Sequence, residues 1–403
     1  MKIKNRKYFL EALWEGLLTV SGTLTSFIIL LIVLFLFTQG VGLFKKPVVE
    51  EGYELVVNSK NPVTFLSASE IKEIFDYEIE EWSALDIMNE ENEITVFRLN
   101  DMERYVELEE ELAPENIPHT LNRIIESNPG MIAFIPKQYI NKDFTANILD
   151  FGEIKPADFF GGKEWYPTAT PAAQFGILPI ILGTLWVSLG AILLALPFGL
   201  AVAVYLSELA NRRTYKLLKP TIELLAGIPS VVYGFFGLVI VVPVIQKVFG
   251  LPVGETGLTG SIILGIMALP TIITISEDAI RTVPRTMREA SLALGANHWQ
   301  TIYRVIIPYA ISGITAAVVL GIGRAVGETM AVLMVTGNSA IIPHTLLTPL
   351  RTIPATIAAE LGEVPKGGAH YQALFMLGCI LFLITLIINL SVEYITAKKR
   401  IKD

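Results

Sequence analysis

The sequence predicts an α-helical polytopic membrane protein with six transmembrane helices and a small α+β extracytoplasmic insert after the first helix. Of its 403 residues, 52% are hydrophobic and 17% are charged, which is typical of a membrane protein and not of a globular enzyme. Charge is distributed unevenly, because residues 45–170 hold 11 Lys and Arg against 26 Asp and Glu. The other residues hold 20 against 13, so an acidic insert interrupts a slightly basic membrane body.

Residues 1–44 are expected to form a cytoplasmic N-terminus and the first transmembrane helix. Four basic residues lie within Met1–Lys7, and the apolar run Leu17–Phe37 follows them. As a helix this run is about 31 Å long, enough to cross the hydrocarbon core of a bilayer. It is longer than the core of a signal peptide, and no small-residue cleavage site follows it. We therefore expect an uncleaved span whose N-terminus lies inside the cell.

Residues 45–170 are expected to fold as an α+β domain outside the cell membrane. Apolar residues over 71–75 have helical spacing, and Ile94–Leu99 alternates as a β-strand does. Met131–Ile135 follows an Asn-Pro-Gly turn and predicts a second short strand.

Residues 171–396 are expected to form a core of five transmembrane helices, followed by a basic cytoplasmic tail at 397–403. The loops that join these helices alternate between basic and poorly basic, and the loop at 281–308 is basic. Since basic loops stay on the cytoplasmic side, we place both termini and this loop in the cytoplasm, at the plasma (inner) membrane. The expected spans are Leu178–Leu206, Leu224–Ile245, Ser261–Ile280, Ala310–Thr336 and Ala373–Ile395.

The stretch Pro284–Pro308 predicts two short helices with a sharp bend between them. Pro284 suits the first turn of a helix, where its missing N–H costs nothing, and Gly295 can take the left-handed conformation that ends it. Asn297 and Gln300 have the spacing of an N-cap and its third helical residue. Pro308 is expected to interrupt the second helix.

The fifth expected span contains an arginine in an otherwise apolar helix, within residues 323–338. Placing Arg324 in a bilayer costs at least ~2.5–3.5 kcal/mol, so its side chain must face protein or water. Glu328 lies four residues on, where an ion pair on one helix face can form, and Gly323 and Gly327 would admit another backbone closely. A guanidinium is suited to an oxyanion. The alternative is that Arg324 and Glu328 only satisfy each other and lock two helices.

The stretch Gly227-Ile228-Pro229-Ser230 breaks helix geometry near the start of the third span. A hinge at Gly227, Pro229 and Ser230 and a tight helix contact explain it equally well. No P-loop sequence occurs, and neither a catalytic cluster nor a metal-ligand spacing is evident. The lone Cys379 lies in an apolar span and is expected to pack there. We therefore predict a non-enzyme without a cofactor or metal, whose energy comes from a partner.

One motif resembles a known family. Glu289-Ala290-Ser291, then Gly295 and the run 305–308 (Val-Ile-Ile-Pro), is similar to the coupling loop of ABC-transporter permease subunits. The family pattern has Glu-Ala-Ala, a glycine four positions on and a late Ile-x-Leu-Pro, so Ser291, Val305 and Ile307 are mild departures. The resemblance implies that this loop docks in a groove of an ATPase subunit and transmits its motion.

The resemblance extends over residues 160–395. The segments 323–338 (GRAVGETMAVLMVTGN) and 222–237 (IELLAGIPSVVYGFFG) resemble the permeases of phosphate ABC transporters. The residues after Thr329 favour the C-type subunit over its A-type sister. This implies half of a translocation pathway, a sister permease, two ATP-binding subunits, an extracytoplasmic phosphate-binding protein and membrane lipid as partners, inorganic phosphate as substrate, and no nucleic acid. The residues that would line the pathway are Gly323, Arg324, Gly327, Glu328 and Thr329.

The acidic insert resembles part of the periplasmic phosphate-binding proteins. Arg98 and Asp101 match that family, but Met102–Tyr105 stands where the family has a Gly-Ser-Gly-Thr turn that holds the anion. We therefore expect no anion capture by the insert and hypothesise that it docks or orients the binding protein. An insertion without a role is the alternative.

Two other functions remain open at this point. An arginine does not by itself choose between tetrahedral anions, so a permease for molybdate or sulfate fits the same residues. A membrane sensor that reads the occupancy of the binding protein is an alternative of a different class. For a permease, we expect alternating access that is driven through the loop at 281–308.

Overall fold

The computed structural model describes the chain over residues 2–106 and 113–400. It contains six helical segments that are long and apolar enough to cross a membrane. The chain divides into two compact units. The membrane unit comprises Met1–Gly42, Ile180–Glu363 and Gln372–Asp403, and the insert unit comprises Leu43–Pro179 and Val364–Tyr371. The basic residues expected at the two chain ends, including the tail at 397–403, lie outside the described side chains.

Two long helices begin and end the membrane unit, α1 (Lys2–Val41) and α15 (Ala369–Arg400). From Leu13 onward, the apolar side chains of α1 are mostly exposed. Near its end, Phe35 packs edge-on against Phe375 at 5.6 Å between ring centroids. Cys379 is buried in this contact, within 3.3 Å of where a side chain on Gly40 would lie. This placement fits its expected packing role.

The centre of the membrane unit is built from α5 (Leu178–Val204), α9 (Gly257–Arg281) and α12 (Ile307–Gly327). Small residues let these helices approach closely. A β-carbon on Gly321 would lie 3.0 Å from Ile272 of α9, and one on Gly313 only 2.4 Å from the Ala279 β-carbon. Apolar residues of α5, α9 and α12 bury one another in a common core.

The third expected span begins later than predicted. An amphipathic helix, α6 (Arg212–Ala226), ends before the Gly-Ile-Pro sequence, and α7 (Ser230–Phe236) begins after it. A π turn then joins α7 to α8 (Val242–Phe249), so the apolar segment runs over Ser230–Phe249 and not from Leu224. The prediction was wrong at this end because Pro229 cannot continue the helix of α6.

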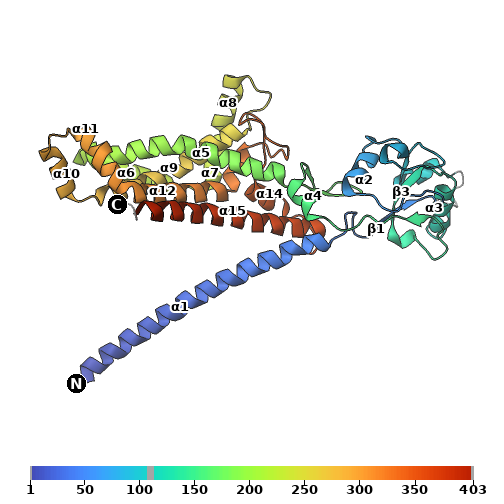
Figure 1. The fold of residues 1–403 in the computed structure, drawn as a ribbon, viewed down its shortest axis with the longest axis horizontal. Coiled ribbons are helices and arrows are strands. Elements are labelled where there is room, and N and C mark those ends of the chain that lie inside the picture. The colour runs from blue at the N-terminus through green and yellow to red at the C-terminus, as the bar shows by residue number, and fades with distance from the viewer. Residues whose placement is uncertain (1, 107–112, 401–403) are drawn as a thin grey trace. The chain divides into compact units, whose positions relative to one another are not determined.

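The loop at 281–308 contains the two expected short helices, α10 (Arg285–Ala293) and α11 (His298–Thr301). They lie at the same end of the membrane unit as the end of α15, whereas α14 (Ile353–Glu360) lies at the opposite end (Figure 1). The predicted interruption at Pro308 is wrong, because a π turn at Ile302–Ile306 carries the chain directly into α12. The wider turn accommodates the proline ring and its missing N–H.

The fifth expected span begins and ends earlier than predicted, at His298–Gly327 and not at Ala310–Thr336. Helix α12 ends at Gly327, Glu328 is extended (φ −71°, ψ 133°), and a short helix α13 (Met330–Val335) follows. The continuous helix predicted to Thr336 is therefore wrong. Apolar composition could not reveal the break, because both sides of it are equally hydrophobic.

The insert unit is an α+β fold around a four-stranded sheet of order β2-β3-β1-β4. Strand β3 pairs with β2 in parallel and with β1 antiparallel, and it is buried along almost its whole length. Helix α2 begins with a capping box between Ser67 and Glu70. The bounds are β1 (Tyr53–Val57), α2 (Ala68–Phe75), β2 (Thr95–Arg98), α3 (Ile117–Glu126), β3 (Met131–Pro136) and β4 (Asn147–Ile148), followed by α4 (Pro156–Gly161), β5 (Trp165–Tyr166) and β6 (Gln174–Phe175).

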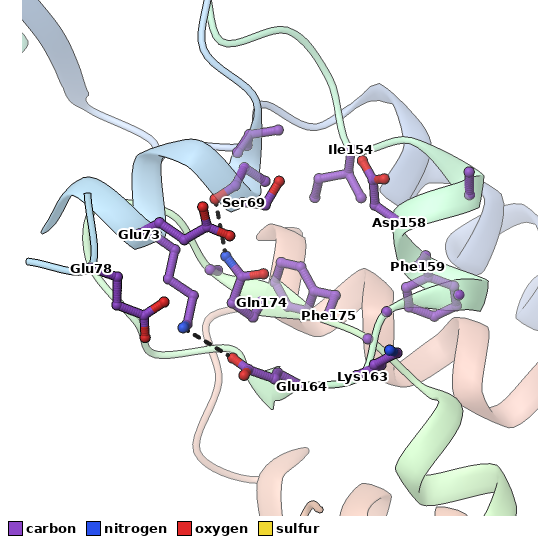
Figure 2. Close-up of a pocket in the computed structure, with 18 residues that line it drawn as sticks. Ser69, Glu73, Glu78, Ile154, Asp158, Phe159, Lys163, Glu164, Gln174 and Phe175 are labelled. Atoms are coloured by element: carbon purple, nitrogen blue, oxygen red, sulfur yellow. Dashed lines mark hydrogen bonds and ion pairs between the residues drawn. The ribbon is translucent and has the colours of Figure 1, made fainter. Parts of the chain in front are cut away.

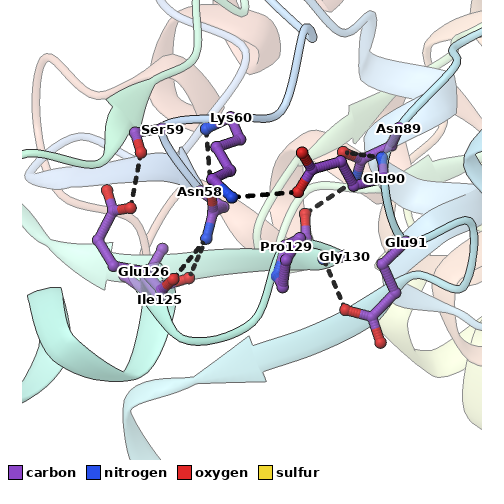
Figure 3. A network of polar contacts seen from close by, with 10 residues as sticks. All are labelled: Asn58, Ser59, Lys60, Asn89, Glu90, Glu91, Ile125, Glu126, Pro129 and Gly130. Atoms are coloured by element: carbon purple, nitrogen blue, oxygen red, sulfur yellow. Dashed lines mark hydrogen bonds and ion pairs between the residues drawn. The ribbon is translucent and has the colours of Figure 1, made fainter.

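A polar network fixes the turn before β3 (Figure 3). The Asn58 amide donates to the carbonyl oxygens of Ile125 and Glu126 at 3.0 and 2.9 Å, which holds the end of α3. Asn89 donates to the Pro129 carbonyl at 2.8 Å, and the backbone N–H of Gly130 donates to Glu91 at 3.2 Å. The turn is therefore braced from both sides, as a strand that starts in the core requires.

Candidate functional site

Arg324 lies in the last turn of α12, where a cation is favoured by the helix dipole. Its neighbours Ala325 and Val326 are buried in the core, whereas Arg324 is half-buried and Gly323 is exposed. Nothing in the described chain lies within 4 Å of where a side chain on Gly323 or Gly327 would be. One side of α12 therefore packs on α9, and the side with Gly323 and Gly327 is uncovered.

The predicted ion pair between Arg324 and Glu328 does not form. Because α12 ends at Gly327, the two side chains do not share a helix face. The Glu328 carboxylate instead accepts a long hydrogen bond of 3.5 Å from the Ala331 N–H, at the start of α13. Among the residues that the structure describes, Arg324 has no acidic partner. The close backbone approach predicted for the two glycines is also absent within the described chain.

Thr329 follows the break, with its hydroxyl donating to the Gly327 carbonyl at 3.3 Å. It is half-buried, as are Arg324 and Glu328. The five residues from the Gly-Arg-Ala-x-Gly-Glu-Thr sequence thus gather at the junction of α12 and α13. Their role in a pathway stays a prediction.

The helix break at Gly227–Pro229 is bridged by one hydrogen bond. The Tyr233 hydroxyl of α7 donates to the Leu225 carbonyl of α6 at 2.8 Å. Ile228 in the break packs against the core that also contains Ala325 of α12. The break is therefore joined to the helix that carries Arg324, although motion at Gly227, Pro229 and Ser230 stays a prediction.

The loop at 281–308 presents an exposed surface. Gly295 has a φ of +86°, the left-handed conformation that was expected, and Asn297 and Gln300 form the predicted capping box. Pro284 lies just before α10 and not within its first turn. No residue of α10 is fully buried, and Leu294 is 89% exposed. Glu289 and Ala290 are exposed and Ser291 is half-buried, so this surface is open to a partner.

A comparison with known protein families assigns the chain to one of them. Residues 195–401 match the family described as the binding-protein-dependent transport system inner membrane component. The chain belongs to this family.

Relatives support the same assignment. The probable ABC transporter permease protein YqgH of Bacillus subtilis is 38% identical over 248 residues, which is 62% of this chain and 80% of that protein. The phosphate transport system permease protein PstC of Mesorhizobium japonicum is 38% identical over 255 residues, or 59% and 77%. Of the solved structures, the inward-facing methionine ABC transporter MetNI matches 54% of this chain and 93% of its own, at 19% identity and a TM-score of 0.44. The family and the two relatives show that the protein is a multi-pass membrane permease and a translocation-pathway subunit.

The permease also contains buried charges that sequence reasoning missed. Glu277 of α9 is fully buried and pairs with Lys219 of α6 at 2.9 Å and with Arg281 at 2.8 Å. The Arg281 guanidinium lies 4.4 Å from the centre of the Tyr215 ring. Burial would lower the pKa of Lys219, but its hydrogen bond and attraction to Glu277 outweigh burial and raise it. A carboxylate inside an expected span was the signal for this cluster, just as Arg324 was for its own site.

A second buried carboxylate holds the loop at 281–308. Glu208, on the π turn that ends α5, pairs with Arg288 of α10 at 2.8 Å. Arg288 also donates to the Ile280 carbonyl at the end of α9, at 3.0 Å. Both carboxylates lie at the end of the membrane unit where α10 lies.

Arg98 of the insert unit, the arginine that matched the phosphate-binding proteins, is engaged within its own chain. The Arg98 guanidinium donates to the Phe75 carbonyl at 3.2 Å and lies 5.3 Å from the centre of that ring. A cavity of about 530 Å³ beside α2 is lined by Glu73, Glu78 and Glu164 among others, and Lys72 there pairs with Glu164 at 3.3 Å (Figure 2). These carboxylates disfavour an oxyanion.

Proposed function

We propose that this chain is the C-type permease subunit of an ATP-driven phosphate importer. It forms half of the translocation pathway with an A-type sister subunit, and two ATP-binding subunits supply the energy. An extracytoplasmic phosphate-binding protein delivers the anion to the outer face. The observation that carries the substrate class is Arg324, a half-buried guanidinium in a membrane-spanning segment without an acidic partner in the described chain.

The physical reason is the cost of such a charge. An unpaired arginine within a bilayer is destabilising, so a ligand or a partner must compensate it when the complex is assembled. A phosphate oxyanion supplies both the charge and the paired acceptors that a guanidinium fork fits. The uncovered glycines beside Arg324 leave room for the anion or for the sister subunit.

The exposed loop at 281–308 is the proposed site at which the permease couples to the ATPase. We propose that the exposed residues Glu289 and Ala290, with Ser291 and Gly295, form the face that meets the ATPase. The membrane orientation proposed from basic loops places this face in the cytoplasm, with both termini. The insert unit is then extracytoplasmic, where its acidic surface would orient the binding protein.

The test is ATP hydrolysis by the complete complex in lipid, with the binding protein present, as phosphate, sulfate or molybdate is titrated. Stimulation by phosphate alone is the expected result. Stimulation by sulfate or molybdate alone would keep the architecture and replace the substrate. No stimulation by any anion, in a complex shown to be assembled, would favour the sensor and contradict the proposal.

A further inference from the structure

We propose that Glu208 and Arg288 form the tether through which a movement of α10 reaches the transmembrane helices. This inference rests on the proposed coupling of α10 to an ATPase. It assigns a positioning role to two residues that lie outside the coupling motif itself. The tether is defined as the ion pair Glu208–Arg288 together with the hydrogen bond from Arg288 to the Ile280 carbonyl.

Helix α10 makes few described polar side-chain contacts other than those of Arg288. The helix has no fully buried residue, so it gains little from apolar packing against its own chain. Its described polar side-chain contacts with neighbouring segments are those of Arg288 and a 3.0 Å hydrogen bond between the hydroxyls of Ser291 and Thr301. The Ser291 contact leads to Thr301 of α11, which continues through the π turn into α12, whereas the Arg288 contacts lead to α5 and α9.

The contacts of Arg288 lead to two transmembrane helices. Glu208 lies at the end of α5, and Ile280 lies in the last turn of α9. The Arg288 guanidinium therefore contacts the ends of two of the three helices that form the centre of the membrane unit. The third helix, α12, packs along α9. A displacement of Arg288 would therefore be transmitted through α9 to the helix that carries Arg324.

The ion pair between Glu208 and Arg288 is largely shielded from water. The Glu208 side chain is only 4% exposed and that of Arg288 is 25% exposed, so water does not screen the pair as it screens surface pairs. Glu208 lies on a π turn, a conformation that is rarer and less regular than the α-helix and is frequent at functional sites. We therefore expect the buried ion pair to stay formed while the backbone around Glu208 changes conformation.

The experiment compares variants of this chain in the complete complex, reconstituted in vesicles. Uptake of phosphate, sulfate and molybdate is measured with the wild type first, and the anion that it carries becomes the readout for the variants. Failure of the wild type to carry phosphate thus counts against the proposed substrate and leaves the tether to be tested. The quantity compared is anion taken up per ATP hydrolysed.

Glu208→Gln and Arg288→Met are expected to lower uptake per ATP about tenfold, a typical size for coupling between two sites, while ATP hydrolysis and ATPase binding persist. Arg288→Lys, which keeps the charge, should retain more coupling than Arg288→Met. Arg285→Gln is the matched control, since it removes a cation from the same helix that is exposed. Its uptake per ATP should equal that of the wild type.

The double variant Glu208→Gln with Arg288→Met distinguishes an ion pair that only stabilises the fold from one that transmits motion. Removing one partner leaves a buried charge, and removing both relieves that penalty. If the pair only stabilises the fold, the double variant recovers coupling, which would overturn the tether. If the pair transmits motion, the double variant assembles with the ATPase and stays uncoupled. Normal uptake per ATP in both single variants, or an equal loss in Arg285→Gln, would also overturn it.

Discussion

Arg324 and Glu277 are charged residues of membrane-spanning segments that differ in their partners. Glu277 is fully buried between two cations, whereas Arg324 has no acidic partner in the described chain. A buried carboxylate with two partners serves the fold, because its desolvation is offset locally. We propose that Arg324, which has no acidic partner in the described chain, serves a ligand or partner outside the chain.

Substitutions should separate these two roles. Glu277→Gln leaves Lys219 and Arg281 without their buried carboxylate and is expected to cost about 3–5 kcal/mol, seen as a lower midpoint of thermal unfolding in detergent. Glu328→Gln removes a carboxylate that makes no ion pair in the described structure, so its stability should change by no more than about 0.5 kcal/mol. Equal destabilisation by both changes would contradict this division.

Sequence reasoning reached Arg324 because one charge interrupts an apolar run, and that signal is local. It failed for the partner, since the i,i+4 rule assumes a helix that the structure ends at Gly327. The tether could not be predicted at all. Glu208 and Arg288 are 80 residues apart, and only the packing of α5 beside the loop brings them together.

At the scale of elements, α9 and α12 depend on small residues where they cross. Apolar length located α9 within four residues at either end, but it placed the end of α12 nine residues too late, at Thr336 and not at Gly327. It could not locate the π turns or the break after Gly327, because these depend on hydrogen-bond register and packing and not on hydropathy. The capping box at Asn297 was predictable, because a cap is set by residues three positions apart.

Gly313 and Gly323 of α12 allow a matched test of the packing between α9 and α12. Gly313→Ala would place a methyl group 2.4 Å from the Ala279 β-carbon, and we expect it to destabilise the chain by about 1–3 kcal/mol. Gly323→Ala meets nothing within 4 Å, so it should be neutral or slightly stabilising in the isolated chain. Thermal unfolding of the two purified variants measures both. A larger loss for Gly323→Ala would show that α12 is packed by the opposite face.

For the whole molecule, the two units have separate cores, so the insert unit should be removable. Deleting residues 50–155 is expected to leave assembly with the ATPase intact and to lower uptake at limiting concentrations of binding protein. The loss should be greatest at low ionic strength, where attraction to the acidic insert is least screened. Uptake equal to that of the wild type, at equal expression, would leave the insert without a docking role.

The orientation of the chain can be measured because its one cysteine, Cys379, is buried. Leu294→Cys and Met88→Cys place thiols at positions that are 89% and 95% exposed. A membrane-impermeant thiol reagent added to intact cells, stripped of any outer membrane, should label the Met88 position only. The Leu294 position should react after the membrane is opened. The reverse pattern would contradict the placement of the loop at 281–308 in the cytoplasm.

The most direct test of the central claim is phosphate uptake by a complex that contains Arg324→Gln. The glutamine keeps hydrogen-bonding ability and removes the charge, so the account predicts that uptake is abolished while the complex still assembles and binds its ATPase. Arg324→Lys should restore part of the uptake, because it returns the charge without the guanidinium fork. Near-normal uptake with Arg324→Gln would remove Arg324 from the pathway and contradict the account.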